Sequence, residues 1–274
     1  MSNSVGRSLF VATLLCFALL TMPSRAQQVV VAGELTRLHL GDAGSTIAGR
    51  IAVNNRGPEA RNVRAYLTDY QQSRSGGSYP PAGTLARSSA EWMTITPGEQ
   101  RIDPGASGIF AYEMHIPATD LPIGTFWNVI MIEGGDQSQA APPDAGDQPA
   151  VPAFSITPRF RTAVRVDTQV GPIDTDGIAF INRHVVDTGA GVELEVLLAN
   201  TGNSRLPVKL WLEQFGSDQL NNRLGEAQEV LIYPGGERRV RLPLASSIKN
   251  GEETLIVADV EGTMLGALYK LQLP

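Results

Sequence analysis

One β-strand pattern occurs twice in this chain with identical internal spacing. In the first copy a strand ends in the Asn-x-Gly turn Asn55–Gly57, and the strand that follows contains Tyr66. In the second copy the turn is Asn200–Gly202, and the aromatic residue at the matching position is Trp211. Helical periodicity is nearly absent, and short β-branched runs recur between Gly, Pro, Asn and Asp. The sequence therefore predicts an all-β protein with two tandem immunoglobulin-like β-sandwich domains.

The strands expected in the first half lie near residues 29–32, 35–40, 47–54, 62–70, 92–95, 108–116, 124–133 and 154–166. Those expected in the second half lie near 178–184, 191–199, 208–215, 228–233, 237–244, 253–260 and 265–273. We assign residues 27–168 to the first domain and 169–274 to the second. The Gly-, Pro- and Asp-rich segment 134–152 is expected to be a mobile loop inside the first domain, with an interdomain linker as the alternative.

The first 26 residues have the features of a cleaved secretory signal peptide. Arg7 supplies the positive start, an apolar run follows, and Ser24-Arg25-Ala26 places small residues at the cleavage site. The run is about 14 residues long, which is short for a membrane span. We therefore expect export through the Sec pathway and no membrane insertion after cleavage.

Charge and cysteine content restrict the partners and the compartment. Removal of Arg7 and Arg25 with the signal changes the net charge from −6 to −8, which disfavours nucleic acid and anionic lipid as partners. Cys16 is the only cysteine and leaves with the signal, so the mature chain has no disulfide although an exported protein could form one. We expect a periplasmic location, with the cell surface as the alternative.

Motifs of catalysis and metal binding are missing from the sequence. The three histidines, His39, His115 and His184, lie in different expected strands, and no metal-ligand spacing occurs. No nucleophile elbow or phosphate-binding glycine loop is present. The sequence predicts no catalytic residue, no metal site and no cofactor.

The last expected strand of the first domain has two contrasting faces. One face carries the arginines Arg159, Arg161 and Arg165. The other face is apolar and carries Phe154, Ile156, Phe160, Val164 and Val166. Guanidinium groups bind carboxylates in a bidentate manner. The alternative is a solvated edge strand whose charges prevent aggregation. Among the aromatic residues, Trp127 and Trp211 are expected in the core and Tyr79 on the surface.

Read in order, the first half resembles the N-terminal domain of the periplasmic pilus chaperones of the chaperone–usher pathway. The resemblance covers about residues 29 to 166 and is divergent. It is carried by Thr36-Arg37-Leu38, Val53-Asn54-Asn55, Ile95-Thr96-Pro97 with Arg101-Ile102-Asp103-Pro104-Gly105, the strand Phe126-Trp127-Asn128, and the Arg-rich last strand.

This resemblance implies a function. Such chaperones are not enzymes; they donate their last strand to the open edge of an exported pilin-like subunit, and an outer-membrane usher is a further partner. By position, Arg37 and Arg161 would anchor the subunit's C-terminal carboxylate. The donated strand would carry Phe154, Ile156, Phe160 and Val164.

Two alternatives remain open at this stage. One is a structural or adhesive surface protein whose loops contact protein or glycan, and the other is an accessory domain of a carbohydrate-active enzyme. Tyr79 is the residue for a glycan contact, because a flat exposed ring stacks on a sugar.

Overall fold

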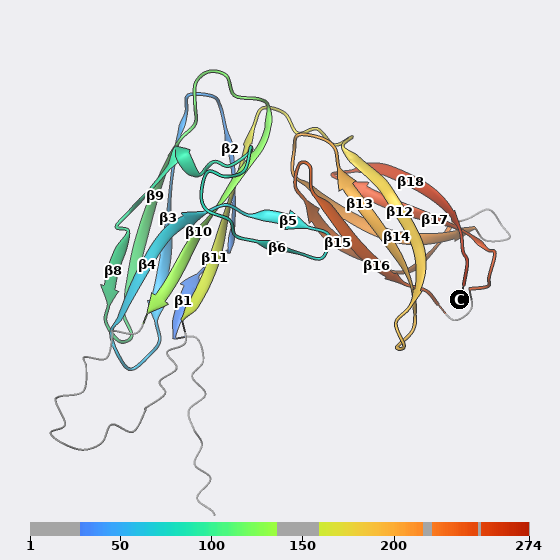
Figure 1. Ribbon diagram of the computed structural model, residues 1–274, viewed down its shortest axis with the longest axis horizontal. Coiled ribbons are helices and arrows are strands. Elements are labelled where there is room, and N and C mark those ends of the chain that lie inside the picture. The colour runs from blue at the N-terminus through green and yellow to red at the C-terminus, as the bar shows by residue number, and fades with distance from the viewer. Residues whose placement is uncertain (1–27, 136–158, 216–220, 246–247, 274) are drawn as a thin grey trace, which may run out of the picture.

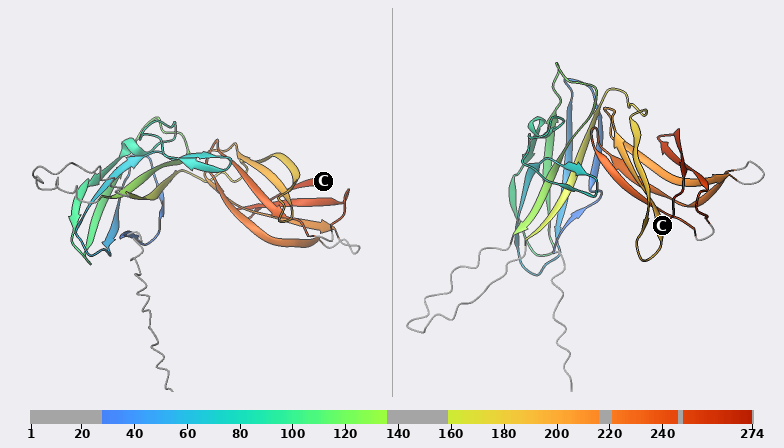
Figure 2. Two further views of the ribbon diagram at one scale, coloured as in Figure 1. Left: turned by 60° about the horizontal axis from the view of Figure 1, so that its bottom comes forward. Right: turned by 45° about the vertical axis from the view of Figure 1, so that its right-hand side comes forward.

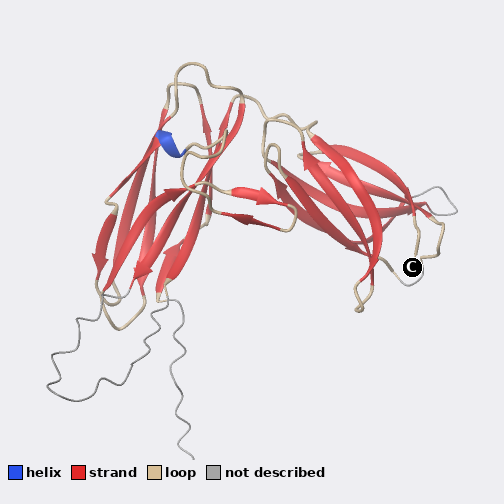
Figure 3. Cartoon of the chain, viewed as in Figure 1, coloured by secondary structure: helices blue, strands red, loops and turns tan. Residues whose placement is uncertain are grey.

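The computed structural model describes residues 28–135, 159–215, 221–245 and 248–273, and its fold is almost entirely β (Figures 1 and 3). The expected signal peptide, most of the expected loop 134–152, Phe154 and Ile156 lie outside the described residues. The one helix in the described ranges is the short 3-10 turn η1 (Ala90–Trp92). No helix of this part of the chain is long and apolar enough to cross a membrane.

Two sheets face each other in the first sandwich. One has the order β1-β3-β9-β7 and the other the order β2-β11-β10-β4-β8. The strands of the first sheet are β1 (Val29–Ala32), β3 (Thr46–Asn55), β9 (Ser107–His115) and β7 (Met93–Thr96). Those of the second are β2 (Thr36–Gly41), β11 (Phe160–Val170), β10 (Gly124–Gly135), β4 (Arg61–Thr68) and β8 (Glu99–Ile102).

The second sandwich also consists of two sheets, with the orders β12-β13-β16 and β15-β14-β17-β18. The smaller sheet contains β12 (Ile178–Asp187), β13 (Val192–Asn200) and β16 (Glu237–Pro243). The larger one contains β15 (Asn221–Ile232), β14 (Leu206–Phe215), β17 (Glu253–Val260) and β18 (Thr263–Lys270). The all-β prediction is confirmed, and β8 and a hairpin in the polar segment after Tyr70 are strands that the sequence patterns missed.

Each sandwich has its own apolar core, formed by alternate residues of its strands. In the first, Ile51, Phe110 and Met114 are fully buried, and in the second, Leu194, Leu210 and Ile256 are. Burial of such side chains stabilises each domain by about 1.5–3 kcal/mol per residue.

The repeated Asn-x-Gly turn forms the same buried corner in both domains. The Asn55 side-chain amide donates to the Glu59 and Ile102 carbonyls at 2.7 and 3.0 Å, and its carbonyl accepts from the Gly57 N–H at 3.0 Å. Asn200 makes the matching bonds to the Ser204 and Ile232 carbonyls at 2.7 and 2.9 Å and to the Gly202 N–H at 2.9 Å. Each side chain ties a strand end, its turn and a neighbouring strand together.

The two sandwiches lie at an angle and meet at one end (Figures 1 and 2). Strand β11 runs to Val170, two residues past the domain boundary expected from the sequence, and Gly171 with φ +74° begins the connection to β12. At this junction the rings of Trp127 and Tyr233 approach to 4.7 Å between centroids. The Tyr233 hydroxyl donates to buried Asp167 at 2.8 Å.

A hairpin from the first domain also contacts the second. Its strands are β5 (Gln71–Ser73) and β6 (Gly76–Ser78), and it extends toward β15 and β16 (Figure 1). The Gln72 amide donates to the Leu231 carbonyl at 2.7 Å, and the Arg239 N–H donates to the Arg74 carbonyl at 3.0 Å. The polar segment after Tyr70, in which the sequence patterns predict no strand, is therefore part of the interdomain interface.

The aromatic residues only partly follow expectation. Tyr79 is 49% exposed, as the sequence predicted. Trp127 is buried, but at the domain junction rather than inside a sandwich. Trp211 lies outside the buried core and packs against the Arg223 guanidinium at 4.9 Å, so its core prediction is wrong. A cation–π contact allows this ring to remain on the sheet surface.

Replacement of Asn55 by Ala is expected to lower the free energy of unfolding by about 3 kcal/mol, because it leaves buried carbonyls without donors. Asn200→Ala should have a similar effect in the second domain. Chemical denaturation measures both, and Asn54→Ala, which removes one exposed bond to Ser107, is the control with a loss below about 1 kcal/mol. Equal effects of Asn54→Ala and Asn55→Ala would contradict the role of the corner.

Candidate functional site

The candidate site is strand β11, whose two edges are paired over different lengths. Its ladder with antiparallel β10 extends over the whole strand, from Phe160 to Val170. Its ladder with parallel β2 covers only Arg165–Val170. Among the described residues, no strand pairs with this second edge over the first half of β11. The Arg165 N–H donates to the Leu35 carbonyl on that side, so by alternation the main chain of Arg161 and Ala163 faces the same way.

The apolar face of β11 is divided between the protein's own core and the surface. Val164 and Val166 are fully buried in the core of the first sandwich. Phe160 is 41% exposed at the start of the strand. The expectation that Val164 is donated to a partner is therefore corrected, because its side chain already packs inside the domain. For Phe160, whose side chain is partly exposed, donation to a partner stays a prediction.

Arg37 lies on β2 beside Val166 and therefore on the inner face of the sheet. Its Nε is buried and makes no hydrogen bond to the described residues. Next to it, His39 Nε2 and the Tyr112 hydroxyl share a hydrogen bond of 2.9 Å. A buried donor without a partner costs about 1–3 kcal/mol, so its retention favours a function in ligand binding.

The charge of Arg37 affects both neighbours. Burial, and after it the nearby guanidinium charge, hold the pKa of His39 below its ordinary value. Burial raises the pKa of the Tyr112 hydroxyl, and the charge of Arg37 works against this rise. Near neutral pH the pair is therefore uncharged, and Arg37 is the cation of this group.

Arg161 lies on the opposite, outer face of the sheet and contacts Glu133 of β10. Its Nε is 2.6 Å from Glu133 Oε2. Arg159 and Arg64 contact the other oxygen at 3.6 and 3.8 Å, and the Tyr66 hydroxyl donates to Oε2 at 3.1 Å. The structure does not bring Arg37 and Arg161 together, because an alternating strand sends them to opposite faces.

Burial works to raise the pKa of Glu133, but the bonds from Arg161 and Tyr66 and the charge of Arg64 hold it below its ordinary value. Burial and the same hydrogen bond raise the pKa of the Tyr66 hydroxyl. Glu133 is thus an anion at neutral pH. Sequence patterns did not identify Glu133 or Arg64, since both lie on other strands and meet β11 only through sheet pairing.

Arg165, the third arginine of the row, is part of the domain junction. Its Nη2 donates to the Thr36 hydroxyl at 3.1 Å, and its guanidinium lies 5.7 Å from the Tyr70 ring and 6.0 Å from the Tyr233 ring. The three arginines that share a face in the sequence therefore have different surroundings along the strand.

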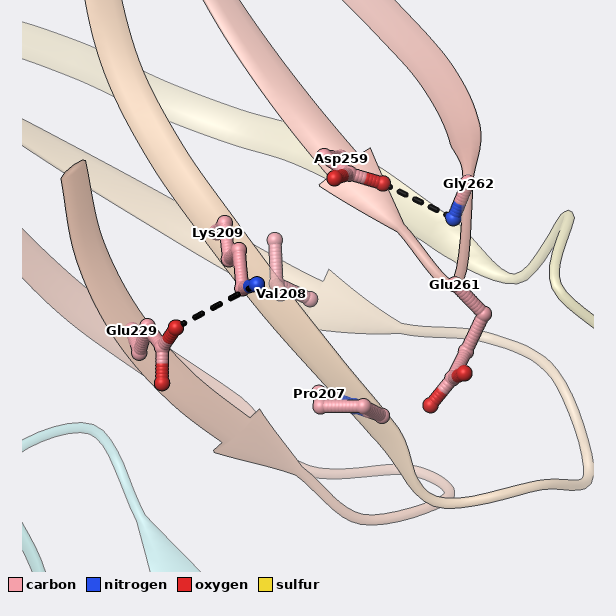
Figure 4. Close-up of a pocket in the computed structure, with 7 residues that line it drawn as sticks. All are labelled: Pro207, Val208, Lys209, Glu229, Asp259, Glu261 and Gly262. Carbon is pink, nitrogen blue, oxygen red and sulfur yellow. Dashed lines mark hydrogen bonds and ion pairs between the residues drawn. The ribbon is translucent and has the colours of Figure 1, made fainter.

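A separate pocket of about 450 Å³ lies in the second domain, away from β11 (Figure 4). Lys209 Nζ is 3.5 Å from Glu229 Oε1, and Asp259 accepts from the Gly262 N–H at 2.8 Å. Lys209, Glu229 and Asp259 thus each have a partner inside the pocket. In the described part of the chain, no three His, Cys, Asp or Glu side chains are placed to hold a metal ion.

No known family model matches the sequence, and no curated protein is significantly similar to it. Solved structures do match. A chain in the structure of a chaperone–tip adhesin complex of CFA/I fimbriae biogenesis has 14% identity and a TM-score of 0.50, with 90% of this chain and 100% of that chain covered.

Two further solved structures show lower scores. The class 5 fimbriae chaperone CfaA has 13% identity and a TM-score of 0.47, with 90% of this chain and 99% of that chain covered. The Salmonella enterica SafA pilin in complex with the SafB chaperone has 11% identity and a TM-score of 0.44, with 90% and 98% covered.

The chain has the two-domain fold of the fimbrial chaperones, and the resemblance expected from the sequence is confirmed as a likeness of fold. The likeness extends over both domains, whereas the sequence motifs indicated it only for about residues 29 to 166.

The lowered pKa of His39 predicts a loss of stability in mild acid. Because the unfolded chain binds the proton more readily than the folded one, the free energy of unfolding should fall as the pH drops below the ordinary value of 6.5. Thermal unfolding from pH 7.5 to 5 measures this effect. His39→Gln should reduce the loss, and His115→Gln, which changes an exposed histidine, should not; equal profiles for His39→Gln and the wild type would contradict the assignment.

Proposed function

We propose that this protein is a non-catalytic, periplasmic chaperone-like protein that binds exported, pilin-like subunits by strand pairing. The observation that carries the proposal is the unequal pairing of β11, whose first half has a strand on one edge only within the described residues. Main-chain hydrogen bonds along such an edge give affinity, and side chains at alternate positions fill pockets of the partner. The likeness of fold to a chain of a chaperone–adhesin complex supports this reading.

Phe160 is the described side chain that fits a pocket of the subunit. It lies at the start of the open edge and is 41% exposed, although it is a large apolar residue. Phe154 and Ile156 precede it with the same alternation and remain part of the proposal from the sequence. Val164 acts in the protein's own core, where it fixes the strand that is donated.

Arg37 is the proposed anchor for the subunit's C-terminal carboxylate. Its buried, unsatisfied Nε lies beside the residues at which the β2 ladder begins, so a carboxylate bound there would lie at the end of the open edge. A bidentate arginine–carboxylate pair is worth about 1.5–3 kcal/mol, which corresponds to about tenfold to a hundredfold in affinity. Arg161 lies on the opposite face of the sheet and is not part of this proposed anchor.

Arg37→Gln is expected to reduce recovery of an exported subunit in a periplasmic pull-down by about tenfold or more. Mass spectrometry identifies the bound protein, and thermal unfolding checks that the variant is folded. Arg50→Gln, which removes the same charge from an exposed position on β3, is the matched control and should retain the partner. Full recovery with Arg37→Gln would contradict the anchor.

Phe160→Ser should weaken recovery of the same partner, because it removes the apolar group at the open edge. The matched control is Ile109→Ser on β9, since Ile109 is also a large apolar residue on the surface, 52% exposed. A pull-down in which the wild type and both variants recover no exported protein would oppose the proposed function as a whole.

A further inference from the structure

Three arginines share one carboxylate on the outer face of the first domain. We call Arg64, Arg159 and Arg161 with Glu133 the Glu133 arginine cluster. The Glu133 side chain is 7% exposed, whereas those of Arg64, Arg159 and Arg161 are 56%, 67% and 57% exposed. The cluster therefore has a buried anion below and three accessible cations above it.

One arginine is sufficient to neutralise Glu133. Arg161 makes the short contact of 2.6 Å, and the Tyr66 hydroxyl satisfies the same oxygen. Arg159 and Arg64, at 3.6 and 3.8 Å, add two positive charges close to the first. Because the Arg64 and Arg159 side chains are more than half exposed, water screens these two longer ion pairs and they contribute little to stability. Stability therefore does not explain the excess charge.

The excess charge suits an anionic ligand. Each guanidinium has five N–H donors, and its contact with Glu133 engages one nitrogen, so donors remain for a second anion. Glu133 holds the three guanidinium groups in place. This reduces the side-chain conformational entropy that the arginines would lose when a ligand binds. The Glu133 arginine cluster is thus a prepared site for carboxylates.

We propose that the Glu133 arginine cluster binds a run of acidic side chains on the exported subunit, outside the segment that pairs with β11. The identity of the partner rests on the proposed function. Arg161 and Ala163 have their main chain on the open edge, so a subunit paired there would lie against the cluster. The net charge of −8 expected for the mature chain opposes extended polyanions such as nucleic acid or an anionic membrane, while a short acidic segment meets only the local positive field.

The test uses the mature protein and two synthetic peptides with amidated C-termini, octaglutamate and octaglutamine. The amide removes the terminal carboxylate that Arg37 is proposed to bind. Octaglutamate should bind, octaglutamine should not, and the affinity should fall as salt rises from 50 to 300 mM. Arg64→Gln with Arg159→Gln should weaken octaglutamate binding about tenfold or more.

The matched control is Arg50→Gln with Arg101→Gln, which removes the same charge from exposed positions on β3 and β8 and should leave binding unchanged. Equal weakening by both double variants would show a general charge effect and overturn the proposal. Tighter binding of a sulfated oligosaccharide of the same charge would also overturn it, because the site would then take glycan rather than protein.

The two proposals can fail separately. If octaglutamate binding depends on Arg64 and Arg159 but the pull-down recovers no exported protein, the anion-binding role of the Glu133 arginine cluster is supported and the chaperone function is opposed. If the double variant Arg64→Gln with Arg159→Gln recovers the subunit at the wild-type level, the chaperone function is supported and the binding of acidic side chains by the Glu133 arginine cluster is opposed.

Discussion

Strand β11 has a different partner on each edge, and the positions of the main functional groups follow from this. Its second half is held between β10 and β2, and there Val166 is buried in the core and Asp167 lies at the domain junction. Its first half has β10 on one side, and no described strand pairs with the other. One continuous strand therefore contains both the half with an open edge and the half that reaches the domain junction. Because of this, the groups proposed to bind a partner are rigidly connected to the contact between the domains.

The junction depends on a few large side chains from both domains. Tyr233 lies between Trp127 and Asp167, and its hydroxyl bond satisfies an acid whose pKa burial raises. Arg205 lies 3.3 Å from the same carboxylate, and the β5–β6 hairpin adds a main-chain hydrogen bond and bonds of the Gln72 side chain at a second point. Two separate points of attachment restrict rotation more than one does, so the proposed binding edge has a defined orientation relative to the second domain.

Local patterns predicted the strands well because period-two alternation and turn residues are properties of short segments. The repeated Asn-x-Gly turns were identified in the same way, and Asn55 and Asn200 form equivalent corners. The errors have a common origin. Val164 and Trp211 are apolar residues whose surroundings depend on which sheet face meets another layer, and alternation does not reveal which face that is.

Residue order along each strand is enough to predict two β-sandwiches and a row of arginines on one face of β11. The contacts of those arginines depend on how the strands pair in the folded chain. Glu133 and Arg64 come from neighbouring strands, and parallel pairing with β2 places Arg37 on the opposite face from Arg161. Sheet register is a long-range property, set by packing between segments far apart in the chain, so the separation of Arg37 on the inner face from the Glu133 arginine cluster on the outer face could not be derived from local spacing.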